Sequence, residues 1–137
     1  GKAITEADCL KWLEVTERNY RNRGYGMSAL VARSSGEVVG FCGLVHPGGQ
    51  DEVEIKYALG RRWWGAGLAT EAVQAMLRHG AWAHGMSRII ATVAPANAAS
   101  QRVLEKVGMI HAGIRKNDDG SATNVFEWRS SEAGTAF

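Results

Sequence analysis

The sequence of 137 residues predicts a single domain, 1–137, of the α/β (α+β) class, with a mixed, mostly antiparallel central sheet flanked by helices. Strand-like runs outnumber helical patterns, and three of them precede any long apolar helical stripe. Two strand-like runs enclose that stripe, and a strand–helix–strand crossover makes its two strands parallel. The other strand-like runs are joined by short glycine turns, which are typical of antiparallel hairpins.

Composition excludes several classes of protein. Lys and Arg exceed Asp and Glu by 16 to 14 without a basic block, so we expect no nucleic-acid partner. No apolar run approaches the roughly 18 residues that span a membrane, so we expect no membrane partner. Cys9 and Cys42 form neither a disulfide framework nor a zinc motif, which favours a reducing, cytoplasmic location. Because the chain opens at Gly1 without Met, we expect residues to precede it, and an upstream targeting segment stays open.

The first element is predicted to be an amphipathic helix. Thr5 and Asp8 resemble a capping box with Asp in place of Glu, and apolar residues then recur at helical spacing as far as Tyr20. The polar, glycine-containing stretch 21–26 ends it.

Three strands follow this helix. The apolar runs 29–32 and 38–45 flank a Ser-Gly turn and predict an antiparallel hairpin. After a turn over 46–51, apolar residues alternate with polar ones over 53–59, which predicts a third strand.

The main helix is predicted from Leu68 to near Gly85, where small and apolar residues recur at spacings of three and four. The partly β-branched run 89–94, ended by Pro95, predicts a buried strand.

The last elements are a short helix and a hairpin. Asn97 is a candidate cap for the helix, and Gly108 stands where a left-handed C-terminal residue is expected. Strands over about 109–115 and 123–129 flank the turn 117–120. A sheet edge or the first helix would be compatible with a homodimer.

The densest chemical signal is the stretch 61–72, where a strand ends, a glycine loop follows and a long helix begins. Amide groups at a helix start lack internal acceptors, so an anion such as a pyrophosphate fits there if Gly65 and Gly67 allow close approach. An ordinary strand-to-helix turn explains the glycines equally well. The dinucleotide fingerprint fails at Thr70, which stands where a third small residue belongs. A phosphate loop of the Gly-Lys-Ser/Thr type is also missing, since Gly-Lys occurs only at the first two residues.

Three motifs in order resemble the GNAT superfamily of N-acetyltransferases across nearly the whole chain. Arg62-x-x-Gly65-x-Gly67 is similar to the acetyl-CoA loop of that family, 54–59 to the strand before it, and 94–109 to its second cofactor motif. The Trp-Gly-x-Gly-x-Ala-Thr-Glu-Ala run and Asn-x-x-Ser are most similar to the RimJ/RimL branch, which acetylates protein N-termini and small amines. The resemblance implies a GNAT-type sheet whose first strand is missing from this chain.

The resemblance implies acetyl-CoA as co-substrate and no metal. Amides from Trp64 to Thr70 would hold the pyrophosphate, and strand 57–59 would splay from 89–94 so that its backbone binds the pantetheine arm. Asn97 would bond to that arm, although a plain N-cap role explains it equally well. The expected cofactor-binding residues are Tyr57, Ala58, Leu59, Arg62, Trp64, Gly65, Ala66, Gly67, Leu68, Ala69, Thr70, Asn97 and Ser100.

Two catalytic residues are expected from the same resemblance. Glu54 matches a position where family members carry a general base, and the alternative is a solvated carboxylate paired with Lys56. Ser100 matches the serine that the RimL branch places near the sulfur, and the alternative is a hydroxyl bonded back to its own helix. Many family members place a general-acid Tyr where this chain has Leu104.

The expected activity is direct transfer of an acetyl group from acetyl-CoA to a primary amine, either a protein N-terminus or a small molecule. The alternative is a CoA-binding, non-catalytic GNAT-like module.

Overall fold

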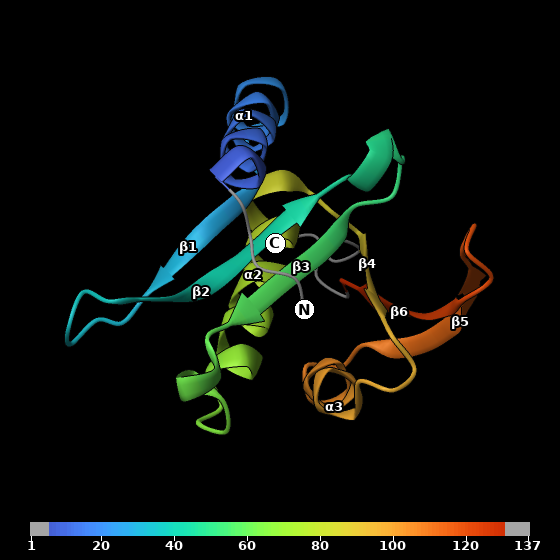
Figure 1. The fold of residues 1–137 in the computed structure, drawn as a ribbon. Coiled ribbons are helices and arrows are strands. Elements are labelled where there is room, and N and C mark those ends of the chain that lie inside the picture. The colour runs from blue at the N-terminus through green and yellow to red at the C-terminus, as the bar shows by residue number, and fades with distance from the viewer. Residues whose placement is uncertain (1–5, 131–137) are drawn as a thin grey trace.

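The computed structural model describes residues 6–130. They form a six-stranded sheet in the order β1-β2-β3-β4-β6-β5, with three α-helices (Figure 1). The elements are α1 (Glu6–Arg23), β1 (Met27–Val31), β2 (Val38–Val45), β3 (Glu54–Leu59), α2 (Leu68–His84), β4 (Arg88–Val93), α3 (Ala98–Lys106), β5 (Ile110–Lys116) and β6 (Ala122–Arg129), with short 3₁₀ turns at Pro47–Gly49 and Arg61–Trp63.

The predicted fold class and the predicted order of helices and strands are confirmed. Strands β3 and β4 are parallel across the α2 crossover, and the remaining neighbours are antiparallel. The last hairpin folds back so that β6, not β5, lies next to β4.

The first helix is longer than the sequence pattern indicated. It continues to Arg23, past the expected end at Tyr20, and Gly24 then adopts a left-handed φ of 80°. Arg21 and Arg23 favour this extension, because basic side chains interact well with the negative end of the helix macrodipole. The predicted capping residue Thr5 lies outside the described residues.

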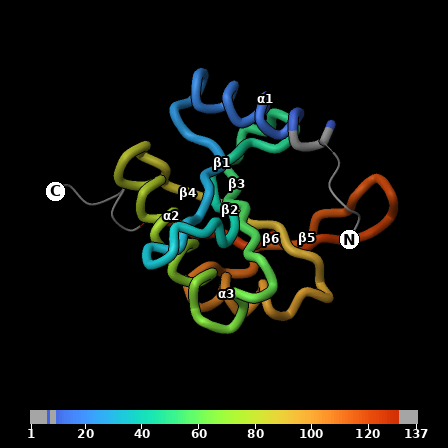
Figure 2. The backbone as a smooth tube through the Cα atoms, turned by 60° about the vertical axis from the view of Figure 1, so that its left-hand side comes forward, coloured from blue at the N-terminus to red at the C-terminus, as the bar shows by residue number. Residues whose placement is uncertain are grey.

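The two faces of the sheet carry different helices. Val73 and Leu77 of α2 join Leu104 of α3 and inward-facing strand residues such as Cys42 in one apolar core. On the opposite face, Trp12 of α1 packs on Phe41 of β2, with ring centroids 5.4 Å apart. Successive strand residues point to opposite faces, so Cys42 and Phe41 mark the two sides. Figure 2 shows α1 separated from α2 and α3 by the first three strands.

No helix within residues 6–130 is long and apolar enough to cross a membrane.

Candidate functional site

Strands β3 and β4 lie together at one end and diverge beyond it. Their recorded register within residues 6–130 is the single pair Glu54 and Ile90, beside which the Ile90 N–H donates to the Val53 carbonyl at 2.9 Å. By contrast, β2 and β3 pair over six residues each. In Figure 1 the two strands run apart from each other toward α3. The splay expected from the sequence motifs is therefore present.

An ion-pair cluster holds the closed end of this divergence. Arg88 of β4 donates to Glu52, before β3, at 2.6 Å and to Glu127 of β6 at 2.7 Å. Arg129 also contacts Glu127, at 2.6 Å. Arg88 and Arg129 lower the pKa of the Glu127 carboxyl by donating hydrogen bonds to its ionised form. The cluster ties three segments together where the strands still pair.

The backbone groups of β3 point alternately toward β4 and toward β2. The Val53 carbonyl accepts the N–H of Ile90 on β4, whereas the Gly60 N–H donates to the Val39 carbonyl on β2. Because backbone groups alternate sides along a strand, those of Tyr57 face the opening and those of Ala58 face β2. The Leu59 carbonyl accepts the indole N–H of Trp64 at 2.9 Å. Of the three residues expected to offer free backbone groups, Tyr57 is therefore the best placed.

A cavity of about 230 Å³ occupies the divergence. It gathers four of the residues that the sequence singled out, although they come from three segments of the chain: Glu54 and Tyr57 of β3, Asn97 before α3, and Ser100 in the first turn of α3. Leu104, which is 1% exposed, closes the same cavity. This is the place where the predicted catalytic residues meet.

Glu54 is buried on the α1 face of the sheet and is 2% exposed, so it is not solvated, although it is paired with Lys56 as the alternative interpretation expected. Its Oε2 accepts from Thr92 Oγ1 at 2.7 Å and from Lys56 Nζ at 3.2 Å. Its Oε1 accepts from Gln50 Nε2 at 3.3 Å. A carboxylate offers about four acceptor positions, so one position on Oε1 is left for a further donor.

Two of these partners, Thr92 and Gln50, were not among the residues expected from the sequence. Thr92 is the one hydroxyl of β4 and follows an apolar run, and its two-residue spacing from Ile90 puts it on the face that Glu54 occupies. The lone hydroxyl was visible in the sequence, whereas the pairing of Ile90 with Glu54 was not. Gln50 lies in the turn before β3, and no periodic pattern points to it.

Ser100 is linked to both sides of the cavity. The Tyr57 hydroxyl lies 2.6 Å from Ser100 Oγ, and the Ser100 N–H donates to Asn97 Oδ1 at 3.0 Å. Asn97 is thus the N-cap of α3, as predicted. Burial raises the pKa of the Tyr57 phenol, because the phenolate would lose its hydration.

The glycine loop begins α2 without a side-chain cap. Gly65 and Gly67 adopt left-handed φ values of 82° and 77°, with open space where a Cβ would stand. The first intrahelical bond runs from the Glu71 N–H to the Gly67 carbonyl, so the preceding amides have no acceptor in the helix. The predicted residues Ala66, Leu68, Ala69 and Thr70 belong to this same turn. Residues 64–67 are exposed and 68–70 are half-buried, and their amides lie at the positive end of a helix.

Arg62 and the tryptophans flank the loop. The Arg62 guanidinium pairs with Glu37 at 3.2 Å and lies 4.7 Å from the centre of the Trp63 ring. Trp64 is 62% exposed and lies 5.6 Å from the Arg61 guanidinium. Arg62 is thus held by protein groups in this structure, whereas the amides of the loop are open.

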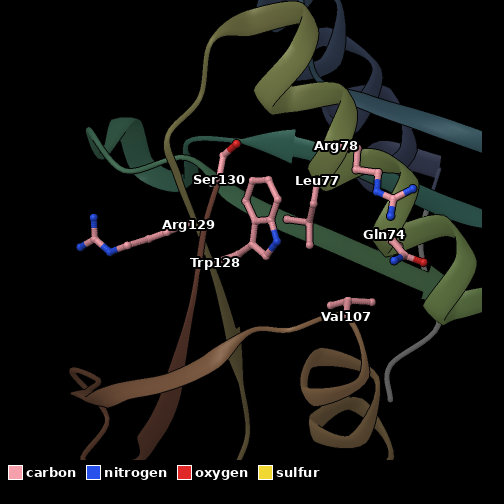
Figure 3. A pocket seen from close by; sticks show the side chains of 7 residues that line it. All are labelled: Gln74, Leu77, Arg78, Val107, Trp128, Arg129 and Ser130. Carbon is pink, nitrogen blue, oxygen red and sulfur yellow. The ribbon is translucent and has the colours of Figure 1, made fainter. Parts of the chain in front are cut away.

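Two further findings bear on other chemistries. Figure 3 shows a second cavity of about 230 Å³, between α2, the end of α3 and β6, in which Leu77 and Trp128 face each other. None of the residues predicted for the site lines it.

Within the described part of the chain, no three His, Cys, Asp or Glu side chains are grouped to hold a metal ion.

Comparisons with known proteins agree with this geometry. The sequence model described as "Acetyltransferase (GNAT) domain" matches residues 1–110. The uncharacterized protein YkkB of Bacillus subtilis is 39% identical over 111 residues, which are 77% of this chain and 63% of YkkB. This chain therefore spans less than two thirds of that relative.

Solved structures share the fold. A putative GNAT-family acetyltransferase from Bordetella pertussis superposes with a TM-score of 0.81 at 29% identity, over 92% of this chain and 78% of that one. The ribosomal L7/L12 alpha-N-protein acetyltransferase RimL, in complex with coenzyme A, superposes with a TM-score of 0.77 at 20% identity, over 91% of this chain and 73% of that one.

Proposed function

Because the chain belongs to the GNAT acetyltransferase family, we propose that it transfers the acetyl group of acetyl-CoA directly to a primary amine. The observation that carries this proposal is the cavity between the diverging strands, where a buried carboxylate and a serine hydroxyl line one space. Asn97-x-x-Ser100 and the loop sequence support the RimJ/RimL-like branch.

The glycine loop suits the pyrophosphate of CoA. Its donors are backbone amides that no side chain caps, and both glycines leave room for a bulky anion. Arg62 would add a charged donor by exchanging Glu37 for phosphate. The backbone of Tyr57 and the side-chain amide of Asn97 would hold the pantetheine arm where the strands diverge.

Glu54 would take the proton of the attacking amine. Its carboxylate faces the α1 side of the sheet, so the acceptor would approach from there while CoA lies across the sheet end. The one acceptor position left on Oε1 is available to the amine or to a bridging water. Lys56 Nζ lies 3.2 Å from the other carboxylate oxygen, Oε2, so it does not occupy this position.

Transfer would be direct, without an acyl-enzyme on the buried cysteine. Burial raises the pKa of the Cys42 thiol to about 12, so it stays protonated and unreactive near neutral pH. Ser100 would donate to the sulfur as the C–S bond breaks.

The acceptor would be a protein N-terminus or a small-molecule amine. The RimL structure supports the first, since it is described as an alpha-N-protein acetyltransferase. Its 20% identity extends to the fold alone, so the acceptor has to be found by experiment.

Calorimetric titration of acetyl-CoA, followed by thiol release against a panel of peptides and small amines, tests the proposal. We expect binding and amine-dependent release. Binding without release from any amine would instead identify a CoA-binding module, and a folded chain that binds no CoA would contradict the proposal.

Replacing Glu54 tests the base. We expect Glu54→Gln to lower kcat by about 100-fold or more, in line with general-base catalysis, while CoA affinity stays unchanged. Glu105→Gln is the matched control, because this carboxylate of α3 does not line the cavity. An unchanged kcat in Glu54→Gln would clear Glu54 of the base role.

A further inference from the structure

The cavity contains two hydroxyl groups in contact: that of Ser100, which the sequence predicted for the site, and that of Tyr57. Leu104 is the apolar side chain that α3 turns to the cavity after Ser100, so α3 offers no phenol at that position. A phenol nevertheless reaches the cavity from the opposite wall, on β3. We propose that Tyr57 is a positioning residue that donates a hydrogen bond to Ser100 as Ser100 donates one to the sulfur of the departing CoA, an inference that rests on the proposed function.

The geometry of the pair allows the hydrogen bond that this role needs. The Tyr57 hydroxyl lies 2.6 Å from Ser100 Oγ, where either hydroxyl can donate, and 3.4 Å from the Ser100 carbonyl oxygen, so Oγ is the nearer acceptor for the phenol proton. When Tyr57 donates to Ser100 Oγ, the Ser100 hydroxyl can still donate its own proton to a group in the cavity. Hydrogen bonds in such a chain strengthen one another, so Ser100 becomes a better donor than a lone serine.

The backbone holds Ser100 in place for this role. Asn97 Oδ1 accepts the Ser100 N–H at 3.0 Å, which caps the first turn of α3. The Tyr57 ring packs against the buried core from β3. Each hydroxyl is therefore carried by a different wall of the divergence, and the pair spans it.

In the proposed step, each bond that breaks is matched by a bond or charge on a named group. The amine nitrogen forms the new N–C bond and loses a proton to Glu54, which passes it to solvent. The C–S bond breaks and its electron pair stays on sulfur. Ser100 donates a hydrogen bond to that sulfur while Tyr57 donates one to Ser100, and the stabilised thiolate takes its proton from solvent.

The Tyr57 phenol is in the protonated form that this role needs. Burial raises the pKa of the Tyr57 phenol above its ordinary value near 10, so the phenol holds its proton at neutral pH. Tyr57 therefore keeps the proton with which it can donate to Ser100.

The test uses product CoA bound to the full chain, with the ultraviolet absorbance of its thiolate followed against pH. We expect the wild type to lower the pKa of the bound thiol by about one unit, because a hydrogen bond to a charged group favours the charged form. Tyr57→Phe should return the thiol pKa toward that of free CoA and lower kcat roughly 10-fold or more, with the KM for acetyl-CoA little changed.

Two further variants complete the design. Tyr20→Phe is the matched control, because Tyr20 of α1 makes a similar pair with Ser28, at 2.7 Å, outside this cavity. Ser100→Ala should lower kcat about as much as the Tyr57→Phe/Ser100→Ala double variant, because the two hydroxyls act as one unit.

The outcomes separate this inference from the proposed function. A wild type that binds CoA and releases thiol, but whose Tyr57→Phe variant keeps the wild-type thiol pKa and kcat, overturns the role of Tyr57 and leaves the transferase intact. A folded wild type that binds no CoA overturns both.

Discussion

Helices α2 and α3 follow strands on the two sides of the same divergence, but they differ in how the unpaired amides of the first helical turn are satisfied. At α3 the Asn97 side chain accepts the Ser100 N–H, and Gln101 donates to the Pro95 carbonyl at 2.9 Å. At α2 the N-cap is Gly67, which has no side chain to accept the amides that follow it.

The difference shows which helix end is completed by the protein and which is left for a ligand. A side-chain cap satisfies an amide that would otherwise need water, and substitution of such a cap costs about 1 kcal/mol. The α2 start forgoes that stabilisation and keeps its donors and its positive dipole end open. Within the proposed function, α2 receives the charged pyrophosphate, while α3 positions the serine beside the thioester.

Closing the α2 start should have the largest effect. In Gly67→Asp, a carboxylate would stand where the pyrophosphate binds and would accept the loop amides itself. Like charges about 4 Å apart repel by several kcal/mol near a protein surface, so we expect CoA affinity to fall by about 100-fold or more in calorimetric titration.

The matched control for this variant is Gly120→Asp. Gly120 has a φ of 86° in the turn between β5 and β6, also with open space at its Cβ position, so both variants carry a similar backbone penalty. Wild-type CoA affinity in Gly67→Asp would show that the pyrophosphate binds elsewhere.

The sequence predicted where the two helix starts lie better than it predicted which side chains contact one another around them. Glycine spacing located the loop, and Asn97 was recognisable as a cap, because both depend on neighbouring residues. The splay of β3 from β4 came from the family motifs. The burial of Glu54 escaped prediction, since the donors Thr92 and Gln50 reach it from a neighbouring strand and a loop.

The Tyr57 phenol shows the same limit. The sequence analysis placed Tyr57 on the strand and considered only its backbone, because its hydroxyl partner is 43 residues away in the chain. Such a pair forms only when the fold brings α3 close to β3. It can therefore be seen in the structure but not in the sequence.

Opening the α3 start should have a moderate effect. Asn97→Ala removes the acceptor of the Ser100 N–H, so we expect the free energy of unfolding to fall by about 1 kcal/mol. Asn97→Ser keeps a capping oxygen and should restore most of that stability while losing the side-chain amide. Thermal denaturation and CoA titration of both variants separate the two roles. If Asn97→Ser binds CoA like the wild type, Asn97 is a cap alone.

The smallest effect should come from Glu71, the acidic residue in the first turn of α2. Its charge stabilises the uncapped helix start in the absence of ligand, by roughly 0.3–1 kcal/mol. In Glu71→Gln we therefore expect a slightly lower free energy of unfolding together with CoA binding that is tighter by roughly two- to fivefold, because the same charge repels phosphate. Both changes should shrink as salt is added, since the groups are near solvent. Stability and affinity that move in the same direction would mean that Glu71 and the ligand do not share this helix end, and the contrast between the two starts would then lose its electrostatic basis.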